Sequence, residues 1–110
     1  MSNEPDYYEN RRTQLQTELE TLLGSRNVYF QPPESIKISY PAIIYERYDI
    51  KNIHANNAVY AGSCIYRITV IDSDPTSEIV SKLSRRYPMI KYNRHFVSEK
   101  LNHDVFTLYY

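Results

Sequence analysis

The sequence has no tryptophan, two glycines and one cysteine, and these shortages exclude several classes of protein. Two glycines cannot build the glycine-rich loops that cradle phosphates in nucleotide-binding proteins. The single cysteine, Cys64, cannot form an intramolecular disulfide, so a disulfide-stapled scaffold is excluded and a reducing cytoplasm is expected. The chain therefore has to be stabilised by an ordinary hydrophobic core.

Long apolar runs and blocks of like charge are also missing. No run of about 18 apolar residues occurs, so a membrane-spanning helix is not expected. The polar segment 1–12 lacks the apolar core of a signal peptide, so export by that route is not expected either. Lysine and arginine together number 13, as do aspartate and glutamate, and this net charge of +0 disfavours binding to a nucleic-acid backbone.

Tyrosine is in excess, with 12 residues against 3 phenylalanines. A tyrosine ring is apolar while its hydroxyl needs a hydrogen-bond partner, which suits half-buried strands and subunit interfaces. The length of 110 residues fits one domain, and 42% hydrophobic with 24% charged residues is typical of a globular chain. A domain of this size leaves part of its apolar surface exposed, so oligomerisation is open.

Hydrophobic periodicity and end signals predict two helices. Asp6–Leu23 has no glycine or proline and places leucines at helical spacing, and Gly24 follows as a left-handed stop. The second helix is expected to begin with Asp74 as its N-cap and Pro75 at the first helical position, and Pro88 ends it. Each helix should bury one apolar stripe.

Runs rich in β-branched and aromatic residues predict five strands. They are 27–31, 42–48, 64–71, 89–97 and 104–110, with a short extended piece at 36–40. In the strand 64–71, Tyr66, Ile68 and Val70 share the face expected to meet the core. The last two strands are separated by residues 98–103 and should form a hairpin. The order αβββαββ predicts an α+β fold, a mixed and mostly antiparallel sheet packed by two helices.

Residues 49–63 differ from the strands on either side. They mix asparagines, a histidine and a glycine with scattered apolar residues in no sustained period, which indicates a long loop or hairpin arm protruding from the single domain. Segments of this length in compact domains are usually functional or mobile. We therefore expect a binding element here, with a plain surface loop as the alternative.

The sequence offers few residues that could form a catalytic or metal-binding site. His103 and Asp104 are adjacent on an expected strand and so point to opposite faces, and the other histidines are His54 and His95, so no metal site is predicted. Cys64 begins a strand with no activating neighbour, which favours an inert buried thiol over a nucleophile. The element order and the balanced charge disfavour an RNA-binding sheet. We expect no enzymatic activity and no cofactor.

Four strings carry a resemblance to a known family. They are residues 27–33 (NVYFQPP), 40–47 (YPAIIYER), 66–75 (YRITVIDSDP) and 101–110 (LNHDVFTLYY). With the element order, they resemble the small tail terminator or tail-to-head joining (neck) proteins of long-tailed bacteriophages, over nearly the whole chain from about Arg11. The resemblance implies a structural virion protein, without catalytic residues or cofactor, that is assembled in the bacterial host cytoplasm. It also implies a ring, usually hexameric, that caps the tail tube, stops its polymerisation and joins it to the head.

A ring with two different faces could join two unlike structures. A heterologous interface that closes by rotation gives such a ring. Sheet edges and the arm would supply the contacts. The expected partners are further copies of the chain, the tail tube protein and a neck or head-completion protein, without sequence-specific nucleic-acid binding. The candidate contact residues are Tyr29, Gln31, Pro32, Pro33, Tyr48, Asp49, Lys51, Asn52, His54, Asn56, Asn57 and Tyr60.

Two alternatives stay open. The nearer is another neck component, such as a head-completion or connector subunit. The more distant is a host-directed binding module or a small enzyme, which would behave as a monomer.

Overall fold

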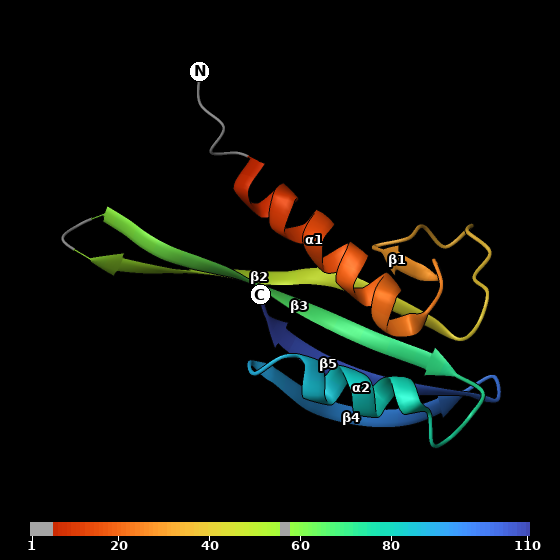
Figure 1. The fold of residues 1–110 in the computed structure, drawn as a ribbon. Helices are drawn as coiled ribbons and strands as arrows, with labels where there is room; N and C mark the ends of the chain where they lie inside the picture. Colours follow the sequence, from red (N-terminus) through yellow and green to blue (C-terminus); the bar gives the residue numbers. More distant parts are fainter. Residues whose placement is uncertain (1–5, 56–57) are drawn as a thin grey trace.

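Both helices lie on one face of a mixed sheet in the computed structural model, which describes residues 6–55 and 58–110 (Figure 1). In chain order the elements are α1 (Asp6–Leu23), β1 (Val28–Phe30), β2 (Ala42–Ala55), β3 (Ala58–Asp72), α2 (Glu78–Arg86), β4 (Ile90–Ser98) and β5 (Leu101–Tyr109). Within these residues the sheet has five strands in the order β1-β2-β3-β5-β4, antiparallel except for the pair β1 and β2. The predicted α+β class and element order are confirmed.

The core lies between the helices and the sheet. Leu15 and Leu19 of α1 are fully buried, as the leucine spacing of that helix predicted. On β3, Tyr66, Ile68 and Val70 are at most 1% exposed, so the face predicted to meet the core does so. Burying a side chain of this size contributes about 1.5–3 kcal/mol. This one interface between helices and sheet is therefore the main source of stability.

The second helix begins later than predicted. Ser77 is the N-cap, and its hydroxyl accepts a backbone N–H two residues on at 3.2 Å, so α2 starts at Glu78. Asp74 instead accepts the N–H of Thr76 at 2.9 Å, and Asp72 accepts the N–H of Asp74 at 3.0 Å. These Asx turns occupy the carboxylates that would otherwise cap a helix. The prediction of Asp74 as the N-cap was therefore wrong.

The β4–β5 hairpin is tighter than predicted. Strand pairing reaches Ser98 and Leu101, so the turn consists of Glu99 and Lys100 alone rather than residues 98–103. Both turn residues have positive φ, 53° and 66°, which is the geometry of a type I′ turn. That turn matches the twist of the two strands, so the backbone adopts it although neither residue type favours it.

One carboxylate ties both helices to the end of β5. Glu18 accepts hydrogen bonds from the hydroxyls of Tyr87 at 2.6 Å and Tyr110 at 3.0 Å, and a guanidinium nitrogen of Arg86 lies 3.4 Å away. Arg11 stacks 4.3 Å from the ring centroid of Tyr110 and donates to its backbone oxygen at 3.0 Å. Burial acts to raise the pKa of Glu18, but the two tyrosines, a neighbouring glutamine and Arg86 outweigh it and lower the pKa below its ordinary value.

Glu18→Gln should lower the free energy of unfolding near pH 7 by about 1–2 kcal/mol, because hydrogen bonds to a charged group are stronger than those to a neutral one. The folded-state pKa of Glu18 is depressed, so its contribution is present above the unfolded pKa of about 4.3 and is lost as pH falls through the folded pKa. Urea unfolding near pH 7 and near pH 3 should show a smaller acid loss in Glu18→Gln than in the wild type. Glu20→Gln, whose carboxylate accepts from Gln16, is the control. Equal acid losses in Glu18→Gln and wild type would contradict the role of Glu18.

Replacing Glu99 and Lys100 by Asn-Gly should raise the free energy of unfolding by about 0.5–1 kcal/mol, because these residues adopt the left-handed geometry of a type I′ turn most readily. Thermal or urea unfolding measures the effect. A destabilised double variant would show that the turn does not have the described geometry.

Candidate functional site

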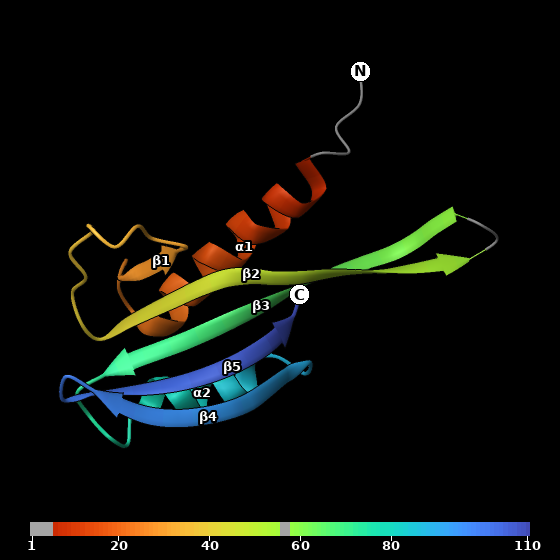
Figure 2. The ribbon, with the colours of Figure 1, turned by 180° about the vertical axis from the view of Figure 1, so that it is seen from behind.

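Strands β2 and β3 continue beyond the rest of the sheet as a two-stranded ribbon (Figure 1). Pairing with β1 ends at Tyr45 and pairing with β5 begins at Ile65, whereas β2 and β3 stay paired as far as Ala55 and Ala58. The ribbon projects along the long axis of the molecule, which measures 51 Å against 26 and 23 Å across (Figures 1 and 2). We call residues 49–63 the ribbon, because both strands of the projecting part fall within them.

A β-bulge marks the start of the ribbon. The register of β2 passes from Arg47 directly to Asp49, so Tyr48 is the extra residue. Its side chain is 59% exposed, and the guanidinium of Arg67 lies 4.5 Å from its ring centroid. A bulge bends its strand and increases the local twist. The bulge therefore changes the direction of the strands at the point where they leave the body.

The ribbon carries almost no charge. Between Asn52 and Tyr66 there is no Asp, Glu, Lys or Arg, although these four types make up 24% of the chain. Natural sheet edges exposed to water are usually protected by charged residues, and a two-stranded hairpin alone is marginally stable in water. Beyond the body, β2 and β3 pair only with each other within residues 6–55 and 58–110. These properties make the ribbon a candidate surface for contact with another chain.

The predicted contact residues lie on β1 and the segment after it, at the β-bulge and on the ribbon strands. Tyr29 lies on β1 opposite Ile44, and the side-chain oxygen of Gln31 accepts the N–H of Arg47, next to the bulge. Pro32 and Pro33 follow Gln31 in the segment that leads to β2. Tyr48 and Asp49 lie at the bulge, while Lys51, Asn52, His54 and Tyr60 lie on the ribbon strands. Asn56 and Asn57 lie outside the described residues. Gln31 therefore lies beside the β-bulge, so the segment after β1 adjoins the base of the ribbon.

The segment after β1 is held by the body of the sheet. The N–H of Gln31 donates to the Tyr45 oxygen at 2.9 Å, and its side-chain oxygen accepts the N–H of Arg47 at 3.2 Å. The extended piece expected at residues 36–40 is not a strand, and the N–H of Ile36 instead closes a turn onto the Pro33 oxygen at 3.1 Å. Gln31 thus extends the β1–β2 ladder.

A pocket of about 370 Å³ lies where the ribbon meets α1. It is lined by Tyr8, Glu9, Arg12, Phe30, Arg47, Cys64 and Tyr66. Arg12 stacks 4.6 Å from the Phe30 centroid and donates to the Tyr45 hydroxyl at 3.4 Å, and that hydroxyl donates to Gln16 at 2.6 Å. Burial raises the pKa of Tyr66 well above its ordinary value, with a contribution from Cys64, so this hydroxyl stays protonated. The polar side chains here brace the base of the ribbon against α1.

Two histidines and the cysteine have contacts or burial typical of structural residues. His95 lies 2.9 Å from the side-chain oxygen of Asn102, and His103 stacks on Phe96 with ring centroids 4.6 Å apart. Cys64 is 2% exposed. In the part of the chain that the structure describes, no group of three or more His, Cys, Asp or Glu residues could hold a metal ion. None of its described helices is long and apolar enough to cross a membrane.

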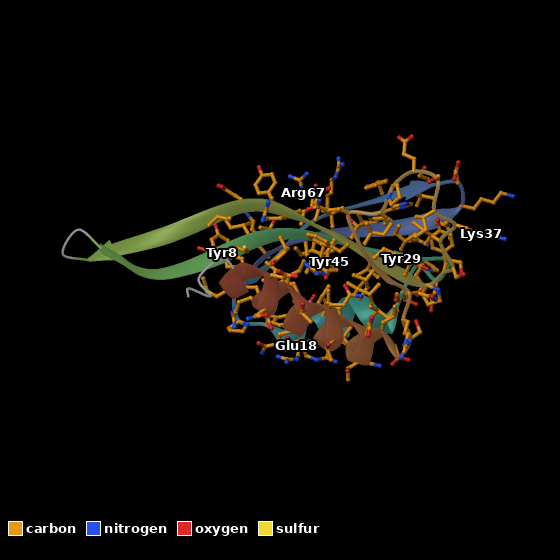
Figure 3. All side chains as sticks on the ribbon, turned by 90° about the horizontal axis from the view of Figure 1, so that it is seen from above. Tyr8, Glu18, Tyr29, Lys37, Tyr45 and Arg67 are labelled. Atoms are coloured by element: carbon orange, nitrogen blue, oxygen red, sulfur yellow. The ribbon has the colours of Figure 1, made fainter. Side chains whose placement is uncertain are left out.

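A second surface was missed by sequence reasoning: the sheet face that the helices leave uncovered, on which Arg67 projects (Figure 3). A groove of about 340 Å³ on this face is lined by Arg67, Thr69, Asn93, Arg94, Phe96 and Val105. The strand register places Val105 between Thr69 and Arg94, and Val105 is 7% exposed, so it forms the floor. Alternation along β4 would put Arg94 on the opposite face, and only a β-bulge brings it here.

No protein-family model, curated protein or solved structure matches this chain. The resemblance to phage tail terminators therefore depends on the four strings and the element order alone.

The Cys64 thiol should react with a disulfide reagent at least about tenfold more slowly in the native protein than in urea, because the fold has to open before the reagent can reach it. Absorbance of the released thiolate measures the rate. The control is a Cys64→Ser chain carrying Ser98→Cys at an exposed position, which should react rapidly without denaturant. Rapid labelling of native wild type would contradict the described burial of Cys64.

Proposed function

We propose that this chain is a structural virion protein of a tailed bacteriophage that forms a hexameric ring on the end of the tail tube. In this role the ring caps the tube, stops tube polymerisation and joins the tail to neck or head-completion proteins. The observation that carries the proposal is the ribbon, which projects from the body and carries almost no charge. The phage context comes from the resemblance of the four strings and the element order.

The ribbon supports a ring because it gives one subunit two different surfaces. A head-to-tail interface needs a surface on one copy that fits an unlike surface on the next. The ribbon extends past the body, and its backbone edges can pair with or lie against a neighbouring subunit. Each copy would then make one outgoing and one incoming contact, and the chain of contacts ends when the ring closes.

A non-enzymatic role agrees with the contacts of the polar side chains. In the pocket at the ribbon base, Arg12 bonds to Tyr45, which bonds to Gln16. A nucleophile needs a base within hydrogen-bond reach. The described contacts of His95 are to the Asn102 amide, and those of His103 are to the Leu101 carbonyl and the Phe96 ring. These groups hold elements together, which is the task of a structural subunit.

A different neck component, such as a connector or head-completion subunit, is the second candidate, because the same ribbon would also serve its ring. The two roles differ in where the protein resides. A tail terminator is present on isolated tails that have no heads, whereas a head-completion subunit is present on tailless heads. Immunogold labelling of the two separated particles distinguishes them.

Removing residues 53–61 should abolish assembly without unfolding the body. The deletion joins Asn52 to Gly62 between Lys51 and Ser63, which are register partners, so the new link is a two-residue Asn-Gly turn. The buried core loses no residue, so the thermal midpoint should change by less than about 5 °C. Assembly on tail tubes of the parent phage, viewed by electron microscopy, should fall to background.

A point variant gives the same test with less disturbance. Val59→Lys puts a charge into the part of the ribbon, residues 52–63, that has no Asp, Glu, Lys or Arg. It should lower the amount of assembled ring at least about tenfold, because burying an unpaired charge in an interface is costly. Ser84→Lys, at an exposed position of α2, is the matched control and should assemble normally. Full assembly by the truncated chain and by Val59→Lys would refute the proposal.

A further inference from the structure

Two guanidinium groups line the groove on the uncovered sheet face, and no carboxylate lines it. Arg67 stacks on Tyr48 and lies 3.6 Å from a Glu46 oxygen at the rim, where the two side chains are 44% and 51% exposed. A pair so exposed is weak because water screens it. Arg94 lies 5.0 Å from the Phe96 ring centroid and makes no ion pair with the described residues.

A β-bulge in β4 places Arg94 in this groove. Tyr92 pairs with Phe106 on the core face, whereas Arg94 pairs with Val105 on the uncovered face, because Asn93 is the extra residue of a β-bulge. Stacking on aromatic rings holds the planes of both guanidinium groups and leaves their N–H edges available. Such an edge matches the two oxygens of a carboxylate or a phosphate.

A protein carboxylate fits this surface better than a nucleic acid does. Proteins that bind nucleic acid commonly contact about 6–10 phosphates, which needs a wide field of cations. The register puts Lys91 on the same face but also Glu46 and Asp49, so the charge around the groove is mixed. Two arginines above an apolar floor suit a short segment with two or three carboxylates.

The chain itself carries such a segment between β3 and α2. Residues 72–78 (DSDPTSE) contain Asp72, Asp74 and Glu78 and no basic residue. Each aspartate uses one oxygen in an Asx turn, which holds the loop in place, and neither makes an ion pair within the described residues. The loop is thus opposite in charge to the groove, which two arginines and no carboxylate line.

The loop cannot reach the groove of its own copy. Alternation along β3 puts Asp72 on the same face as Val70, which the helices cover, whereas Arg67 projects on the opposite face, so the sheet itself keeps the two apart. A contact between the acidic loop and the basic groove would therefore join different molecules.

We propose that the groove lined by Arg67 and Arg94 binds the acidic loop 72–78 of a second copy of this chain. The contact is head-to-tail, since each copy offers its groove to one neighbour and its loop to the other. The inference rests on the proposed function as a ring subunit and adds an electrostatic contact that sets the register between neighbours.

Two charge-swapped chains test the contact. The groove variant is Arg67→Glu with Arg94→Glu, and the loop variant is Asp72→Arg with Asp74→Arg. Sedimentation equilibrium of the purified full-length chains at about 0.05 M and about 0.5 M salt measures self-association. The wild type should associate and weaken with salt, and each variant alone should bind itself at least about tenfold more weakly. An equimolar mixture should recover association, because each groove then meets a loop of opposite charge.

Control variants separate the contact from general charge effects and from misfolding. Lys91→Glu changes a cation on the same face outside the groove, so it should associate within about twofold of the wild type. Asp72→Asn with Asp74→Asn keeps the Asx turns while removing the charge, and should weaken association as the loop variant does. Circular dichroism confirms that each variant is folded.

The inference is overturned if the wild type stays monomeric at low salt, if folded groove or loop variants associate as it does, or if their mixture fails to recover. Binding of a short DNA duplex that Arg67→Glu with Arg94→Glu abolishes would also overturn it, because the groove would then bind nucleic acid. None of these results measures assembly on tail tubes, which is tested separately with the ribbon deletion. The groove contact and the terminator role can therefore fail separately.

Discussion

The pairing of β2 with β3 beyond the edge of the sheet is the constraint on which the rest of the structure depends. Within the body, β2 also pairs with β1 and β3 also pairs with β5, and both strands bury one face in the core. Along the ribbon the two strands have only each other in the described chain. A hairpin of this kind is marginal in water and carries almost no charge, and these two properties make the ribbon the candidate contact surface of the molecule.

The body is built to hold the base of this ribbon firmly. Tyr45, the last residue of β2 that pairs with β1, is hydrogen-bonded through its hydroxyl to Gln16 and Arg12 of α1. Helix α1 is in turn joined to α2 and to the end of β5 through the carboxylate of Glu18. A rigid base matters for assembly, because a projecting element that is already oriented loses less conformational freedom on binding.

The body of the fold could be predicted from the sequence because a buried face leaves a periodic signal. Leucine spacing located α1, and the alternation around Ile68 identified the core face of β3. The strands of the ribbon could not be located this way, since no alternation is needed where the body covers neither face. The Asp72 and Asp74 turns were mistaken for a helix start because aspartate suits both. The basic groove was missed because a β-bulge, which moves Arg94 to the other face, has no sequence signature.

The ribbon and the basic groove would together give a ring subunit two contacts of different character, one apolar and formed largely by backbone, the other electrostatic. The central claim, that the ribbon reaches another copy, is tested most directly by a photo-cross-linking amino acid placed at Tyr60. Irradiation of the assembled protein is expected to give a ladder of covalent multimers, whereas the same group at Ser84 on α2 gives far fewer. Cross-links confined to the monomer at both positions would contradict the claim.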